Sequence, residues 1–375
     1  MKKLICSIIL VFGYLMTVNA QIPDGFYHIK NTGTGRYVSI SDTNPNNYQV
    51  SQAGNVNMAG IRTFLNYDTV AVSPSCVIYV KQLGNGKYDF EAQGSSLYAM
   101  TSYKLPVDIT PAGGSYIISG TYSGITKELA DLDSEDEEGW LASNESPMRF
   151  WNFIPIDTSS EFIGIRPDVK TATGSYWGTI RAGFSFRLAS PGMAAYGISM
   201  AGGTGFTMEP IDQDVIPAGA PVIIRCNSEN IEDNKIEPVL GGYTEYPDWN
   251  WLKGVYCSID VTKHKNVELF DRITMRILGL SDEGELAFVA NPPIERLYIS
   301  RQNEKCLMAN KAYLAVDANA ADVMTLGGYT PEAINSVKSD CKSTGIYTLT
   351  GSRLPDGVTP RAGIYVKNGK KVIIK

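Results

Sequence analysis

The chain of 375 residues has few of the residues and motifs that catalysis usually requires. It contains two histidines, His28 and His264, and neither lies in a nucleophile, metalloprotease or Cys-His motif. The glycine-rich residues 202–205 lie between expected strands, without the strand-to-helix context of a phosphate loop. The paired carboxylates of a glycosidase are spaced in three dimensions and leave no sequence pattern. We therefore expect no enzymatic activity and no catalytic residues.

Cysteine is sparse and has no metal-binding spacing. Apart from Cys6 near the start, the cysteines are Cys76, Cys226, Cys257, Cys306 and Cys341, and no CxxC pair occurs. We expect no zinc site and no cofactor. The number is odd, so two alternatives stay open: buried free thiols throughout, or a single disulfide within residues 158–328.

Long apolar runs are also missing, except at the N-terminus. Lys2 and Lys3 precede the apolar residues 4–16, and the small-residue ending Val18-Asn19-Ala20 follows. This is the pattern of a cleaved secretory signal, and its apolar core is shorter than the roughly 20 residues of a membrane helix. We expect a mature chain that begins at Gln21, is not transmembrane, and is secreted or held at the cell surface.

Basic residues are outnumbered by acidic ones. Loss of Lys2 and Lys3 with the signal leaves 31 basic against 39 acidic residues, a net charge of −8, which argues against nucleic acid as a partner. The acidic run 131–138 invites a calcium interpretation, but Asp136 and Ala142 stand where an EF-hand loop needs glycine and an acid. We therefore expect a solvated loop or helix end there and no metal site.

Strand patterns dominate what remains. Aromatics, glycine and proline are plentiful and helical periodicity is scarce, which predicts an all-β protein. We divide the mature chain into residues 21–157, 158–328 and 329–375, with the first boundary at the polar break Asp157-Thr158-Ser159-Ser160.

Residues 21–157 contain three hairpin-like units at a spacing of about 40 to 50 residues, which fits a β-trefoil. The second unit carries Asn85-Gly86, which predicts a type I′ turn. The opening GFYHIKNTGTGRYVSI resembles the first unit of a ricin-type lectin domain, and Trp151-Asn152-Phe153 stands where that family closes with Gln-x-Trp. No Gln-x-Trp is present, so no sugar-binding residues are carried over from the resemblance.

In residues 158–328, Phe184, Phe186 and Leu188 alternate with polar residues, as in a strand with one buried face. The run Val222-Ile223-Ile224 predicts a strand buried on both faces. The segments Tyr176-Trp177, 192–196, IPAGAPVII (216–224) and ANKAYL (309–314) resemble, in order, a module of secreted surface proteins of Gram-negative gut anaerobes. The resemblance implies a β-rich extracellular module without a catalytic role of its own. Residues 307–316 partly repeat the second half of the earlier segment, which predicts two related hairpins in one β-sandwich.

The last residues, 329–375, predict a small antiparallel sheet with a hairpin at Asn368-Gly369. Their GIYVKNGKKVIIK ending is similar to the end of the sorting domain of type IX secretion. The resemblance implies a protein exposed at the cell surface.

One polar, turn-rich segment concentrates aromatic residues between the two halves of the second domain. Aromatic rings there predict a stacking surface for the apolar faces of sugars, with polar neighbours as hydrogen-bonding partners. The candidate ligand-binding residues are Tyr243, Tyr246, Asp248, Trp249, Asn250 and Trp251. In the alternative interpretation, Trp249 and Trp251 are two residues apart and point into the core together.

Two functions follow from these patterns. The first is a non-catalytic extracellular or cell-surface binding protein, with glycans as the expected ligands, acting as an adhesin or carbohydrate-capture module. The alternative is a structural or assembly protein of the surface that contacts other proteins. Exposed aromatic rings favour the first, and unpaired sheet edges favour the second.

Overall fold

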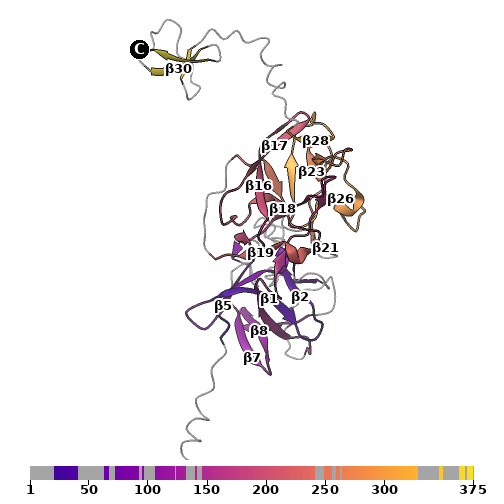
Figure 1. Ribbon diagram of the computed structural model, residues 1–375. Coiled ribbons are helices and arrows are strands. Elements are labelled where there is room, and N and C mark those ends of the chain that lie inside the picture. Colours follow the sequence, from indigo (N-terminus) through magenta and orange to yellow (C-terminus); the bar gives the residue numbers. More distant parts are fainter. Residues whose placement is uncertain are drawn as a thin grey trace, which may run out of the picture. The chain divides into compact units, whose positions relative to one another are not determined.

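The computed structural model describes residues 21–40, 63–66, 72–92, 95–96, 106–122, 124–131, 140–141, 146–240, 249–255, 259–261, 264–327, 346–348, 363–367 and 370–374. Internal contacts divide the chain into two units, residues 1–328 and 329–375, and each is described by itself. The described residues form strands and three short 3-10 turns, with no α-helix among them (Figure 1). The all-β prediction is confirmed. Within these ranges, no helix is long and apolar enough to cross a membrane.

The first sheet is built around its earliest strand, β1 (Gly25–Asn31), which pairs antiparallel with β2, β4 and β11. Its other strands are β2 (Tyr37–Ile40), β3 (Thr63–Asn66), β4 (Ile78–Gln82), β5 (Tyr88–Ala92), β6 (Ser95–Ser96), β7 (Asp108–Ala112), β8 (Ser115–Tyr122), β9 (Ile125–Leu129), β10 (Trp140–Leu141) and β11 (Phe150–Pro155). Tyr27 and Ile29 of β1 pack with Phe90 and Trp151 in one core. The expected hairpins β1–β2 and β4–β5 form, while the three-fold trefoil arrangement stays a prediction.

The turn between β4 and β5 differs from the type I′ turn that the Asn-Gly pair predicted. Gly86 has a φ of 79°, but Asn85 is not among the residues with positive φ. The N–H of Gly86 donates to the carbonyl of Leu83 at 3.1 Å, and Leu83 donates to Lys87 at 2.7 Å. A five-residue loop with one left-handed glycine therefore replaces the two-residue turn, and asparagine needs no positive φ there.

The second sheet contains ten strands in the order β13-β14-β18-β16-β17-β28-β24-β23-β27-β20. They are β13 (Val169–Lys170), β14 (Tyr176–Arg181), β16 (Ala194–Gly202), β17 (Gly205–Pro210), β18 (Pro221–Cys226), β20 (Leu252–Gly254), β23 (Met275–Leu280), β24 (Leu286–Val289), β27 (Ala312–Ala315) and β28 (Val323–Leu326). The sheet curls, so side chains from both ends of this order, Val169 of β13 and Leu252 of β20, pack in one core with Phe288 from the middle of the order. Backbone hydrogen bonds from Arg181 to Asn310 and from Trp251 to Ile198 join elements that are distant in the strand order.

Strand β18 is buried on both faces, as its β-branched sequence predicted. Ile223 packs in the core inside the curled sheet. Val222 and Ile224 pack on the other face, in a second hydrophobic cluster. Successive strand residues point to opposite faces, so the run Val222-Ile223-Ile224 supplies both cores at once.

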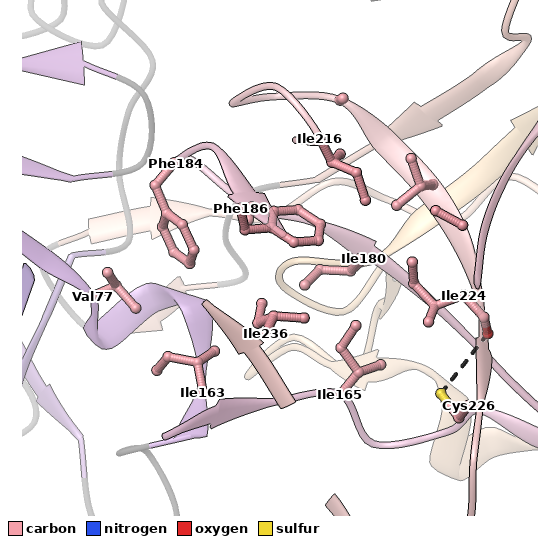
Figure 2. Packing of buried hydrophobic residues seen from close by; sticks show 14 residues of the cluster. Val77, Ile163, Ile165, Ile180, Phe184, Phe186, Ile216, Ile224, Cys226 and Ile236 are labelled. Carbon is pink, nitrogen blue, oxygen red and sulfur yellow. Dashed lines mark hydrogen bonds between the residues drawn. The ribbon is translucent and has the colours of Figure 1, made fainter. Parts of the chain in front are cut away.

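The second cluster lies between the curled sheet and a three-stranded sheet of β12 (Ile163–Gly164), β19 (Lys235–Pro238) and β15 (Phe186–Leu188). Figure 2 shows Phe186, Ile180 and Ile236 pointing toward one another in it. Val77, from the first sheet's part of the chain, belongs to the same cluster, and the rings of Phe26 and Phe184 lie 6.1 Å apart. Residues on both sides of the expected boundary at 157–160 therefore share one apolar contact.

Short elements complete residues 158–328: β21 (Ile259–Val261) with β22 (His264–Asn266), β25 (Tyr298–Ile299) with β26 (Lys305–Cys306), and the 3-10 turns η4 (Ile231–Asp233) and η5 (Ile294–Arg296). A third 3-10 turn, η3 (Pro74–Cys76), precedes β4. In the unit 329–375, β29 (Ile346–Thr348), β30 (Gly363–Lys367) and β31 (Lys370–Ile374) form an antiparallel sheet. Lys367 pairs with Lys370 across the expected Asn368-Gly369 hairpin, which confirms the predicted small sheet.

Three of the five cysteines after the signal lie in the described part of the chain. Cys76, Cys226 and Cys306 are all buried, and Cys226 carries a free thiol; Cys257 and Cys341 lie outside the described residues.

The first residue of the acidic run differs from the expected solvated loop. Asp131 is buried and paired with the guanidinium of Arg36. The rest of the acidic run, residues 132–138, lies outside the described part of the chain.

Candidate functional site

Three of the six candidate binding residues fall in the described part of the chain. Tyr243, Tyr246 and Asp248 lie outside it. Trp249, Asn250 and Trp251 immediately precede β20 and lie beside the middle of β16.

Asn250 fixes this segment to the sheet. Its side-chain Oδ1 accepts from the backbone N–H groups of Ile198 at 3.0 Å and Leu252 at 3.1 Å. Its Nδ2 donates to the carbonyl of Pro221 at 2.9 Å. The amide thus ties β16, β18 and the start of β20 together, and most of its hydrogen-bonding capacity is used within the fold. Its observed contacts position the neighbouring tryptophans.

Trp249 lies over a glycine. A Cβ atom placed on Gly197 would lie 2.7 Å from Cζ3 and 2.9 Å from Cη2 of the Trp249 ring. Because position 197 has no side chain, the Trp249 indole can pack directly against the backbone of β16, and Trp249 is half-buried there. Gly197 faces outward, because Tyr196 and Ile198 on either side contact the inner core.

Trp251 presents more surface than Trp249. Its backbone N–H donates to the carbonyl of Ile198 at 2.9 Å, and its side chain is 48% exposed. Leu252, the next residue, is buried in the core of the curled sheet, so Trp251 points to the outer side. The two indoles thus differ from the core-facing alternative: they lie on the outer side of the sheet, one half-buried and one half-exposed.

A buried charged centre that the sequence did not predict lies elsewhere in the same sheet. Asp168 precedes β13, and its side chain is only 6% exposed. Lys311 donates from Nζ to its Oδ1 at 2.7 Å, and Arg296 Nη2 lies 3.3 Å from the same oxygen. Thr179 donates to Oδ2 from both its backbone N–H, at 2.8 Å, and its hydroxyl, at 3.1 Å.

These contacts decide the ionisation of Asp168. Burial by itself raises the pKa of the carboxyl, but the positive charges of Lys311 and Arg296 and the hydrogen bonds from Lys311 and Thr179 outweigh it. The pKa of Asp168 is therefore held below its usual value. An ionised, fully engaged carboxylate is a poor general acid or base near neutral pH, so this centre is suited to holding strands together.

A small hollow opens beside this charged centre. It is lined by Asp168, Thr179, Ile277, Leu278, Arg296, Leu307, Met308, Lys311, Ala312 and Tyr313. The hydroxyl of Tyr313 donates to Glu268 at 2.9 Å, and burial raises the pKa of that hydroxyl to about 12. Both polar side chains of ANKAYL that reach this centre, Lys311 and Tyr313, are thus engaged with carboxylates of this chain.

Asn310, near the start of the ANKAYL segment, also has a structural role. Asn310 has a φ of 55°, and its Nδ2 donates to the carbonyl of Arg181 at 2.9 Å while its own carbonyl accepts from Arg181 N–H at 3.0 Å. The motif could have indicated a constrained turn, but it gave no sign of Asp168, which lies 143 residues before Lys311. Within the described residues, no group of three or more His, Cys, Asp or Glu side chains is placed to hold a metal ion.

Comparison with known proteins gives no relative on which to rest a function. No family model matches the chain, and neither a curated protein nor a solved structure is significantly similar to it. The function is therefore inferred from the site and the sequence.

Proposed function

We propose that this chain is a non-catalytic extracellular binding protein that takes glycans on the aromatic surface formed by Trp249 and Trp251. The observation that carries the proposal is the half-exposed indole of Trp251, next to Trp249 on the outer side of the curled sheet. A sugar ring has apolar C–H faces that pack on indoles, and aromatic contacts of this kind contribute on the order of 1 kcal/mol per ring beyond area burial.

The surface is held in place before any ligand arrives. Asn250 makes three hydrogen bonds to three different strands or strand ends, and the backbone of Trp251 is bonded to Ile198. A ring that is already fixed loses little conformational entropy on binding, which favours weak polar ligands such as saccharides. The proposal rests on this rigidity as much as on the exposure of the rings.

The rest of the proposal follows from the sequence. The secretory signal at residues 1–20 and the C-terminal tail that resembles a type IX sorting domain favour a secreted protein displayed at the cell surface. A β-trefoil over residues 21–157 and a β-sandwich over 158–328 remain the arrangements we propose for the two larger parts. Neither larger part supplies a set of catalytic residues in our proposal.

A glycan-array screen of the mature chain, residues 21–375, tests the function. We expect retained glycans, and we expect Trp251→Ala to weaken their binding about tenfold, since about 1.4 kcal/mol corresponds to a factor of ten. Because the Trp251 ring is half-exposed, its removal should leave the melting temperature nearly unchanged. Ile125→Ala, which also removes an exposed apolar side chain (55%), is the matched control and should bind as the parent does.

Three outcomes would contradict the proposal. The first is an array on which no glycan is retained above background. The second is binding that survives Trp251→Ala unchanged. The third is a collapse of the melt on that substitution, which would assign the ring to the core.

A second candidate function, assembly through protein contacts, is favoured by a different observation. Four large apolar side chains between residues 269 and 299 are exposed: Leu269, Ile273, Ile294 and Ile299, at 41–55%. Exposed apolar groups of this kind mark contact surfaces when they are contiguous. Sedimentation of the mature chain would support this candidate if it shows self-association that Ile273→Ser and Ile294→Ser abolish.

A further inference from the structure

The register of the curled sheet places an acidic side chain beside the aromatic surface. In the antiparallel pair of β16 and β17, Gly197 lies directly opposite Glu209. Directly opposed residues of neighbouring strands point to the same face, so Glu209 points outward where Trp249 covers Gly197. Glu209 is exposed.

We infer that Glu209 makes the aromatic surface selective for glycans that carry amino groups or are neutral, and against glycans that carry carboxylates. The inference rests on the proposed function, since it concerns which saccharides the Trp249–Trp251 surface accepts. An ionised carboxylate accepts hydrogen bonds from sugar hydroxyls and attracts an ammonium group, whereas it repels a uronate placed on the adjacent ring.

The position of the charge relative to the rings determines this selectivity. Glu209 borders the Trp249 end of the surface, one strand away from the backbone that the indole covers. A sugar stacked on Trp249 therefore brings its ring substituents toward the carboxylate. Charge discrimination of this kind works by an unfavourable contact with the wrong ligand as well as a favourable one with the right ligand.

One cation lies at the other end of the same surface. Lys253 is exposed, and it is two residues from Trp251 on the same side of the strand, because Leu252 between them points into the core. Lys253 lies on the Trp251 side of the surface and Glu209 on the Trp249 side, so Lys253 provides a matched comparison for Glu209. If net charge alone decided selectivity, Lys253 and Glu209 would matter equally.

The test measures binding of three β-1,4-linked oligosaccharides to the mature chain by titration calorimetry: one of glucosamine, one of N-acetylglucosamine and one of glucuronic acid. We expect the glucosamine and N-acetylglucosamine chains to bind, and the glucuronic acid chain to bind at least about fivefold more weakly, as one exposed charge pair allows. Glu209→Gln keeps the side-chain shape and removes the charge. It should weaken glucosamine binding about three- to fivefold, strengthen glucuronate binding by a similar factor, and change N-acetylglucosamine binding less than twofold.

Lys253→Gln is the matched control and should change the ratio of glucosamine to glucuronate affinity less than Glu209→Gln does. A ratio that Glu209→Gln leaves unchanged, while Trp251→Ala still weakens binding, would overturn the inference and leave the proposed function standing. Glucuronate chains that bind as tightly as glucosamine chains would overturn it in the same way. Failure of all three chains to bind, together with an empty glycan array, would remove the proposed function and the inference with it.

Discussion

Lys311 donates a hydrogen bond from its Nζ to Oδ1 of Asp168 at 2.7 Å, across 143 residues of sequence. The carboxylate is nearly inaccessible, and Arg296 approaches the same oxygen from a third segment of the chain. One buried anion therefore holds the region before β13, the 3-10 turn η5 and the start of β27 together. Buried ion pairs contribute little net stability against apolar replacements, but removal of a single partner is costly.

The first prediction concerns this pair. Asp168→Asn should reduce the free energy of unfolding by about 3 kcal/mol, because it leaves Lys311 and Arg296 facing each other without an anion. Urea denaturation of the mature chain, with the midpoint and slope recorded, measures it. In the double variant Asp168→Asn with Lys311→Met, the loss should be smaller than the sum of the two single losses.

The matched control is the exposed pair of Lys87 and Asp108, whose Nζ and Oδ2 are 2.6 Å apart, close to the 2.7 Å of the buried pair, but whose side chains are 34% and 41% exposed. Asp108→Asn should change the free energy of unfolding by less than about 1 kcal/mol, since solvent screens exposed pairs. Equal losses at Asp168 and Asp108 would contradict the structural importance of the buried centre.

Sequence patterns predicted the parts of this fold that depend on near neighbours. The run Val222-Ile223-Ile224 marked a strand buried on both faces because every residue in it is β-branched and apolar, and the structure confirms it. The glycine-rich residues 202–205 also form the expected turn between two strands. Local sequence was less informative at Asn85-Gly86, where a longer loop placed positive φ on Gly86 alone.

Patterns did not predict the contacts that depend on distant elements. Asp168 has no recognisable context of its own, and its importance appears only when β27 brings Lys311 to it. The aromatic segment was recognised from composition, but Asn250 was expected to face a ligand, and its observed contacts are with Ile198, Leu252 and Pro221. Which strand lies beside a polar side chain is a property of the sheet order, and no periodicity encodes it.

The second prediction is a pH dependence caused by His28. Its imidazole is fully buried, neither nitrogen has a hydrogen-bond partner among the described residues, and burial lowers its pKa to about 4. Above pH 6.5 the group is neutral in both states and has no effect. As the pH falls from 6.5 toward 4, the unfolded chain binds a proton that the folded chain does not, so stability decreases, by about 3 kcal/mol in total.

Melting temperatures of the parent and His28→Phe between pH 7.5 and 4 measure this effect. Carboxylates also titrate in part of that range, so the informative quantity is the difference between the two curves. The melting temperature of His28→Phe should rise progressively relative to that of the parent as the pH falls below 6.5. Parallel curves would show that His28 is protonated in the folded state at little cost.

The third prediction uses the apolar contact that residues 21–157 make with residues 158–328. Val77 is buried in the cluster of Figure 2, near Phe184 and Ile163. A fragment of residues 21–160 should fold alone with a cooperative melt, but in it Val77 loses those neighbours. Val77→Thr should therefore destabilise the mature chain by about 1–2 kcal/mol, since it buries a hydroxyl, and leave the fragment almost unaffected.

Chemical denaturation of both proteins, each with and without the substitution, gives the comparison. Val80→Thr is the control, because Val80 lies in the core of the first sheet and should destabilise fragment and mature chain equally. An unfolded fragment would contradict independent folding of residues 21–160. A loss at Val77 that is the same in fragment and mature chain would contradict the shared contact.

The last prediction separates the aromatic surface from the aromatic residues themselves. Gly197→Ala keeps both tryptophans but places a methyl group 2.7 Å from the Trp249 ring and 3.0 Å from Cγ of Asn250, so the indole and the amide must move. We expect glycan binding to fall about tenfold or more and stability to fall by about 1–3 kcal/mol, as for other overpacked sites. Gly84→Ala is the control, because a Cβ there meets nothing within 4 Å. Calorimetric titration and thermal melts of the three proteins decide the matter: a Gly197→Ala variant that binds as the parent does would show that the ligand is held without a fixed Trp249.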